Sequence, residues 1–300
     1  MDALNRPPRI PLEEVRTLAS GVDHSEGICV TPDGTMYVGG ENGQFYRVND
    51  DGTATEVAST GGFLLGLASD AAGRVWACES AQHAVVRLDP RAGTIETVST
   101  GAPDGQMATP NWGAFGPDGT YYVTDSGSWK GRDGRIFVIR GGRTSLWSTD
   151  SIDFPNGCAV SPDGESLWVL ESTPGRLVRI PILNDGSAGQ REILVDLPGT
   201  VPDGITFATD GSVVIACYRP DVVLRWRSDL GVEVLASDPE GTVVAGPTNC
   251  VFYGPGLSRI AFPNIGRWHI SSMEVPGLTG VPLWFPTAEQ LEERRGAGDG

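Results

Sequence analysis

The chain has 300 residues, of which 38 are acidic and 22 basic, so its net charge is −16 at pH 7. A surface this acidic repels nucleic acid and anionic membranes, and we expect neither as a partner. The chain contains no stretch of about 18 apolar residues, and its start lacks the apolar core of a secretion signal. The 5 cysteines include no C-x-x-C pair, which favours a reducing compartment. These features predict a cytoplasmic protein.

Read in chain order, the sequence repeats one unit six times. The typical unit opens with a polar leading residue and a small residue, and an apolar run follows. Leu65 in the second unit and Trp112 in the third are exceptions. Repeats of about 45 residues that each hold several short strands predict a β-propeller. The six leading residues, from the first repeat to the last, are Glu26, Leu65, Asn111, Asn156, Asp203 and Asn249.

Each repeat is expected to form a four-stranded antiparallel blade, with a glycine-containing turn after its first strand. The sixth repeat has no fourth strand of its own before the chain reaches Pro276. A matching segment, residues 14–19, lies upstream of the first repeat, so we expect the N-terminal strand to close the last blade. The prediction is an all-β, six-bladed propeller in a single domain over residues 1–300. Its core covers about residues 12–276, followed by a C-terminal tail at 277–300.

Five of the six leading residues carry side-chain oxygen atoms. If the blades are equivalent around the axis, these oxygens meet at one mouth of the central channel. Such donors suit hard divalent cations, Ca²⁺ above all, with Mg²⁺, Mn²⁺ and Zn²⁺ as alternatives. The competing interpretation is that these residues only form turns, because Pro-Asn-Gly and Pro-Asp-Gly are common turn sequences.

Several of these stretches resemble a known family, that of senescence marker protein, gluconolactonase and luciferin-regenerating enzyme. The resemblance runs from about residue 25 to residue 275. It implies a metal-dependent six-bladed propeller in which Glu26, Asn156 and Asp203 bind one divalent cation. Asn111 would bind the metal or lie near metal and substrate. The most specific stretches are residues 25–27, 154–157, 201–206, 247–249 and 264–269.

Two positions depart from the family pattern. Trp112 follows Asn111 where relatives commonly have Asp, and Thr109 stands where the sugar lactonases have Arg. Loss of that Arg argues against a polyhydroxylated sugar lactone. The tryptophans expected near the mouth favour a less polar lactone.

The function expected from this combination is divalent-metal-dependent hydrolysis of a small lactone. The metal would polarise the carbonyl, and Asp203 would activate water as the catalytic residue. Alternatives are hydrolysis of another ester or a phosphotriester, a hydratase or lyase reaction, or a non-catalytic ligand-binding propeller. The predicted substrate-binding residues are Asn111, Asn249, Trp112, Trp129, Glu171, Tyr218, Arg219, Trp268 and His269.

Overall fold

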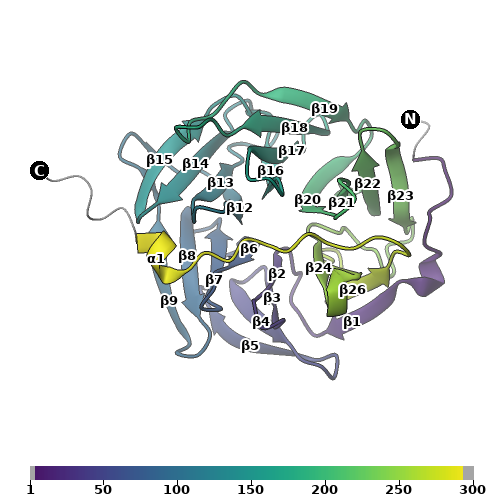
Figure 1. Cartoon of the computed structure of the whole chain (residues 1–300). Coiled ribbons are helices and arrows are strands. Elements are labelled where there is room, and N and C mark those ends of the chain that lie inside the picture. The colour runs from purple at the N-terminus through teal and green to yellow at the C-terminus, as the bar shows by residue number, and fades with distance from the viewer. Residues whose placement is uncertain (1–3, 293–300) are drawn as a thin grey trace, which may run out of the picture.

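The computed structural model describes residues 4–292, which form six four-stranded antiparallel sheets around a central axis (Figure 1). In five of these sheets the strands pair in chain order, and the first strand of each lies nearest the axis. A short hairpin of β10 (Gly101–Ala102) and β11 (Gly105–Gln106) precedes the third blade. This architecture confirms the predicted six-bladed β-propeller.

The first five blades are each built from four consecutive strands. Blade 1 contains β2 (Ile28–Val30), β3 (Met36–Gly39), β4 (Gln44–Val48) and β5 (Ala54–Ser59). Blade 2 contains β6 (Leu64–Ser69), β7 (Val75–Glu79), β8 (Ala84–Asp89) and β9 (Thr94–Ser99). Blade 3 contains β12 (Pro110–Phe115), β13 (Tyr121–Asp125), β14 (Arg135–Arg140) and β15 (Arg143–Ser148). Blade 4 contains β16 (Pro155–Val160), β17 (Ser166–Glu171), β18 (Arg176–Pro181) and β19 (Glu192–Asp196). Blade 5 contains β20 (Val201–Phe207), β21 (Val213–Arg219), β22 (Val222–Arg227) and β23 (Gly231–Ser237).

The sixth blade joins the two ends of the chain. It contains β24 (Val251–Tyr253), β25 (Arg259–Pro263) and β26 (His269–Glu274), and its outer strand is β1 (Arg16–Ser20). β1 pairs antiparallel with β26, so the predicted closure by the N-terminal strand is confirmed. A closed ring leaves no inner strand edge free to pair with another chain. Short 3₁₀ turns at Leu12–Glu14 and Pro255–Leu257 flank these strands.

Tight turns after the inner strands set the blade geometry. In the first blade, Gly34 has φ +86°, a conformation that favours glycine. The preceding Asp33 accepts hydrogen bonds at Oδ1 from Thr31 Oγ1 (2.5 Å) and from the Thr35 backbone (3.1 Å). This Asx-type bonding explains why Pro-Asp-Gly recurs after inner strands. The motif therefore fixes hairpins at the far end of the channel from the leading residues.

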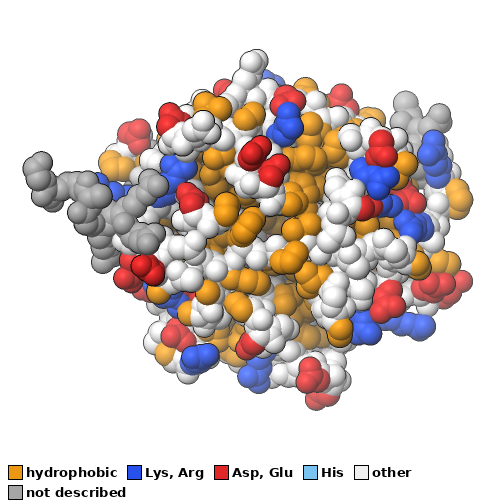
Figure 2. Space-filling view, viewed as in Figure 1, with side chains coloured by type: hydrophobic (Ala, Val, Ile, Leu, Met, Phe, Trp, Pro, Cys, Tyr) orange, Lys and Arg blue, Asp and Glu red, His pale blue; other side chains and the backbone are white. Residues whose placement is uncertain are grey.

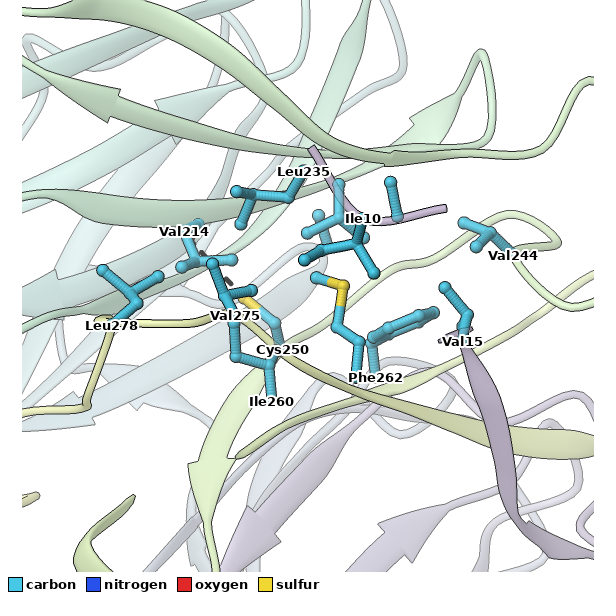
Figure 3. Close-up of a cluster of buried hydrophobic side chains, with 14 of the residues drawn as sticks. Ile10, Val15, Val214, Leu235, Val244, Cys250, Ile260, Phe262, Val275 and Leu278 are labelled. Carbon is cyan, nitrogen blue, oxygen red and sulfur yellow. Dashed lines mark hydrogen bonds between the residues drawn. The ribbon is translucent and has the colours of Figure 1, made fainter. Parts of the chain in front are cut away.

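The hydrophobic core is divided into layers between neighbouring blades. Figure 3 shows the layer between blades 5 and 6, where Val214 and Leu235 face Ile260 and Phe262. The N-terminal segment joins this layer through Ile10, which is 3% exposed. The N-terminus therefore contributes apolar packing as well as the closing strand.

Residues 275–292, here called the C-terminal strap, cross the channel at the end where the inner strands finish (Figure 1). The Val281 backbone donates to the carbonyl of Phe207 at the end of β20 (3.1 Å), and Ala71 donates to the carbonyl of Pro286 (3.0 Å). The strap ends in α1 (Ala288–Glu292). Figure 2 shows apolar side chains around the centre of this face. Among residues 4–292, no helix is long and apolar enough to cross a membrane.

Candidate metal centre

The leading residues converge because glycines allow adjacent inner strands to approach closely. A Cβ atom on Gly27 would lie 1.9 Å from the carbonyl oxygen of Leu65 in the next blade. A Cβ on Gly157 would lie 2.2 Å from the carbonyl oxygen of Asp203. No side chain fits at these distances, so the small residue of the repeat brings the leading residues of neighbouring blades together.

A hydrogen-bond relay fixes the orientation of the Asn156 amide. Its Nδ2 donates to Ser172 Oγ (3.2 Å), and Ser172 Oγ donates to the carbonyl of Pro202 in the next blade (2.7 Å). Because the serine proton is committed to that carbonyl, the serine must accept from the amide nitrogen. Asn156 Oδ1 is buried and has no hydrogen-bond partner. The same relay occurs one blade earlier through Asn111, Ser126 and Pro155.

The two carboxylates of this centre are uncompensated. Burial raises the pKa of Glu26 to about 8, and repulsion from Glu41 adds to the rise. Burial and repulsion from Glu26 raise the pKa of Asp203 well above its ordinary value, and a hydrogen bond from Asn156 offsets part of that rise. Among the described residues, neither carboxylate forms an ion pair with Lys or Arg. Buried charges without partners are costly, so the arrangement favours a bound cation.

The residues fit a hard divalent cation by their donor chemistry. Glu26 and Asp203 supply carboxylate oxygens, and Asn156 supplies an amide oxygen that accepts no hydrogen bond from any residue in 4–292. Ca²⁺ accepts irregular sets of oxygen ligands, whereas Zn²⁺ prefers nitrogen and sulfur. We refer to Glu26, Asn111, Asn156 and Asp203 as the axial centre.

A second group of side chains with the chemistry to hold a metal ion lies near the axial centre. Asp23, His24 and Glu41, here called the rim cluster, have one ligand atom each within 4.8 Å of the others. His24 Nδ1 lies 3.0 Å from Asp23 Oδ1 and 3.3 Å from Glu41 Oε2. Asp23 and Glu41 belong to different loops, and neither was singled out with His24 as a cluster from the sequence. The signal available was a histidine two residues before the first leading residue.

Trp112 lies inside the channel rather than on its rim, so that part of the sequence prediction is corrected. It is 7% exposed, and a Cβ on Gly204 in blade 5 would lie 2.8 Å from its Cη2 atom. The indole therefore extends from blade 3 toward blade 5, made possible by the glycine that follows Asp203. Trp112 also lines an apolar cavity of about 110 Å³ between the inner strands and the strap.

Glu171 is also placed differently from the prediction that it would face a substrate. It is fully buried, and its oxygens accept hydrogen bonds from Ser151 Oγ (2.7 Å) and Arg191 Nε (3.0 Å). Asp125, at the end of the second strand of blade 3, likewise accepts from the backbone of Ala108 and pairs with Arg135. Acidic residues at this position anchor the loop that enters the first strand of their own blade. Glu171 is thus committed to loop structure.

Two tryptophans remain at the surface near the mouth. Trp129 is 52% exposed and packs edge-to-face on Phe154, with ring centroids 4.8 Å apart. Trp268 is 62% exposed, and its Nε1 lies 3.2 Å from Nε2 of His24. Trp129 and Trp268 therefore expose aromatic surface, whereas Trp112 does not.

The other predicted substrate contacts are held by local interactions. Arg219 lies over the Tyr218 ring at 4.5 Å and pairs with Asp221 Oδ1 (2.9 Å). His269 Nε2 lies 3.3 Å from the carbonyl oxygen of Val243. These residues belong to the loops and strand ends of blades 5 and 6.

A family model described as the SMP-30/gluconolactonase/LRE-like region matches residues 25–262, most of the repeat array. The chain belongs to this family. Its fold is similar to a gluconolactonase from Xanthomonas campestris, with a TM-score of 0.75, 21% identity, and coverage of 91% of this chain and 96% of that one. It is also similar to a calcium-binding protein, regucalcin, from Agrobacterium tumefaciens, with a TM-score of 0.70, 19% identity, and coverage of 90% and 96%.

A curated relative is the adipocyte plasma membrane-associated protein of Danio rerio, 30% identical over 115 residues. The match covers 33% of this chain and 28% of that protein. The chain spans less than half the length of the curated relatives it matches. The family match identifies the family of the chain, and the structural similarities at 19% and 21% identity show its fold.

Proposed function

We propose that this protein is a divalent-metal-dependent hydrolase that opens a small lactone. The observation that carries the proposal is the pairing of two carboxylates of raised pKa with an unpartnered amide oxygen at one channel mouth. A cation held by Glu26, Asn156 and Asp203, with Asn111 beside them, would satisfy all of these groups. A family neighbour named as calcium-binding supports Ca²⁺ as the ion, and one named gluconolactonase supports the reaction class.

The bound cation would act as a Lewis acid on the lactone carbonyl. Asp203 would accept a proton from the attacking water, which adds its oxygen to the carbonyl carbon. The bond between that carbon and the ring oxygen then breaks, and Asp203 returns its proton to the leaving alkoxide. The products are a hydroxyl and a carboxylic acid, which releases its proton to solvent at neutral pH. Glu26 would hold the ion, because a cation would offset both the burial of its carboxylate and the repulsion from Glu41.

The surroundings of the centre favour a substrate with little polarity. The Thr109 hydroxyl donates to the Gly127 carbonyl (3.1 Å), and the side chain carries no charge that could bind a sugar hydroxyl. Trp129 and Trp268 expose large apolar surfaces near the mouth. We therefore propose an apolar or aromatic lactone in preference to gluconolactone. A cytoplasmic location remains part of the proposal, because all five cysteines are buried and free.

The test is a lactone panel with and without a chelator. Sugar lactones, alkyl-substituted γ-butyrolactones and aromatic lactones should be assayed with Ca²⁺, Mg²⁺, Mn²⁺ and Zn²⁺ in turn. We expect chelator-sensitive hydrolysis that is fastest for the least polar lactones. Metal binding without turnover of any lactone, ester or phosphotriester would instead support a ligand-binding propeller.

A further inference from the structure

Asn249 has the opposite amide orientation from Asn111 and Asn156. Its Oδ1 accepts a hydrogen bond from the backbone N–H of Cys250 (2.7 Å). A backbone N–H can only donate, so this contact identifies the oxygen side of the amide. The remaining Nδ2 is buried and has no hydrogen-bond partner, while the residue is 1% exposed. Asn249 therefore presents a donor where the other two asparagines present acceptors.

Asn249 lies between Asp203 and Glu26 in the ring of leading residues, and it also lines the cavity of the central channel. On one side, a Cβ on Gly204 would be 2.5 Å from the Asn249 Cα. On the other side, Thr248 Oγ1 donates to the backbone carbonyl of Glu26 (3.0 Å). The Asn249 amide nonetheless donates to neither the Glu26 nor the Asp203 carboxylate. Among the leading residues, the carboxylate oxygens and Asn156 Oδ1 are therefore available to a cation. Asn249 Nδ2 is available to donate to an oxygen atom of a ligand.

An unpaired buried donor costs free energy unless a ligand satisfies it. An amide N–H₂ cannot coordinate a cation, so the missing partner is an acceptor. Donors fixed in advance beside a reacting carbonyl stabilise the negative charge that develops on its oxygen.

We propose that Asn249 Nδ2 donates a hydrogen bond to the substrate carbonyl oxygen as it becomes an oxyanion. This inference rests on the proposed hydrolysis and assigns Asn249 a catalytic role distinct from that of the cation ligands. When the lactone opens, the same donor can hold one oxygen of the carboxylate product. Asn249 is thus the protein's own part of an oxyanion hole whose other part is the bound cation.

The experiment compares Asn249→Asp and Asn249→Ala with the wild type at saturating metal. Asn249→Asp keeps an oxygen that can accept from Cys250 but replaces the donor with a second, negatively charged oxygen, whereas Asn249→Ala removes the donor without adding charge. We expect kcat to fall about 10²–10³-fold in both, the loss typical for one oxyanion-hole donor, with KM little changed. Asn49→Asp makes the same chemical change in the exposed turn after β4 and should leave kcat unaltered.

A binding measurement separates this inference from the proposed function. Calorimetry with methylphosphonate, a tetrahedral oxyanion, should show binding to the metal-loaded wild type and at least about 10-fold weaker binding to Asn249→Ala. Metal affinity should be the same in both proteins. Phosphonate binding that depends on Asn249 without lactone turnover would overturn the hydrolase and leave the donor site intact.

Three results would overturn the donor. The first is Asn249→Ala with wild-type kcat and wild-type phosphonate affinity. The second is a loss of metal affinity in Asn249→Ala as large as in Glu26→Gln, which would make Asn249 a ligand of the ion. The third is a loaded wild type that neither hydrolyses lactones nor binds methylphosphonate, which would overturn both proposals together.

Discussion

The two ends of the central channel are built from the same six inner strands and have opposite character. At the mouth, Glu26 and Asp203 lack cationic partners and Asn156 Oδ1 is unsatisfied. At the other end, the strap covers the channel, and backbone bonds such as Val281 to Phe207 tie it down. Unsatisfied groups at one end and sealed apolar surface at the other indicate that binding and stability reside at separate ends.

The sharpest way to break this comparison is Asp203→Asn at the mouth. The variant keeps an oxygen of similar size while removing the base and one negative charge. Turnover should fall about 10²–10⁴-fold even at saturating metal, the usual cost of losing a general base. Metal affinity should weaken as well, and the melting temperature of the metal-free protein should change little. Steady-state kinetics, calorimetry and thermal unfolding measure the three effects.

Activity that survives both a chelator and Asp203→Asn would contradict the mechanism. A suitable comparison is Asp33→Asn in the first-blade hairpin turn, where the carboxylate bonds only to neighbouring turn residues. That variant should lose some stability and keep its turnover.

At the opposite end of the channel, truncation after Pro276 should lower stability and leave metal affinity unchanged. It removes the strap, including Leu278, which is 2% exposed and packs in the layer between blades 5 and 6. Losing the packing of one such leucine alone costs about 2–5 kcal/mol, so we expect the whole truncation to cost at least that much. Metal affinity should be retained, because no strap residue belongs to the axial centre. Denaturant unfolding and calorimetry test both statements.

A milder version of the same experiment is Leu278→Ala, which should cost about 2–5 kcal/mol without opening the whole channel. If either change abolished metal binding while the protein remained folded, the two ends would not be independent.

The sequence predicted the order of the strands and the closure of the propeller more completely than it predicted the contacts between side chains. Repeat register gives each residue a place in its blade, and that was enough for the strand order, the closure by β1 and the convergence of Glu26 with Asp203. It does not give tertiary partners. The repeat places Glu171 at the end of a second strand, where the loops are expected to open on the mouth, yet its partner Arg191 lies 20 positions away in the chain.

The same limit explains the other differences. The burial of Trp112 depends on the space left by Gly204 in another blade, and the rim cluster joins Asp23 to Glu41 through a loop contact. The amide orientation of Asn249 depends on a single backbone bond. The repeat therefore predicts where each residue sits in its blade, but the direction of its side chain and its partners in other blades can be read only from the folded structure.

Two glutamates at the mouth sharpen the comparison further. If the ion binds in the axial centre, Glu26→Gln should weaken its affinity by at least about 10-fold, by analogy with the loss of groups that support metal ligands. Glu41→Gln should have a smaller effect, because Glu41 acts on Glu26 only through charge. Calorimetric titration with Ca²⁺ measures both. The reverse ranking would locate the ion at the rim cluster with His24.

A pH dependence of the metal-free protein's stability is also expected. Burial raises the pKa of Glu26 from 4.5 to about 8, so the folded protein holds a proton near pH 7 that the unfolded chain has released. Between these values the folded state binds more protons, and the free energy of unfolding must therefore fall as pH rises. It should level off above the folded-state pKa.

A cation at the axial centre displaces that proton, so the loaded protein should lack this slope. Binding near pH 7 should release protons from Glu26 and Asp203, because the pKa of each is raised in the metal-free protein. Calorimetry in buffers of different ionisation enthalpy detects this release. Glu41→Gln should shift the slope to lower pH, since it removes the repulsion that adds to the effect of burial. A metal-free protein whose stability is flat across this window would mean that Glu26 is already ionised there. The ionised Glu26 carboxylate would then need a bound cation to stabilise the fold as well as to polarise the substrate.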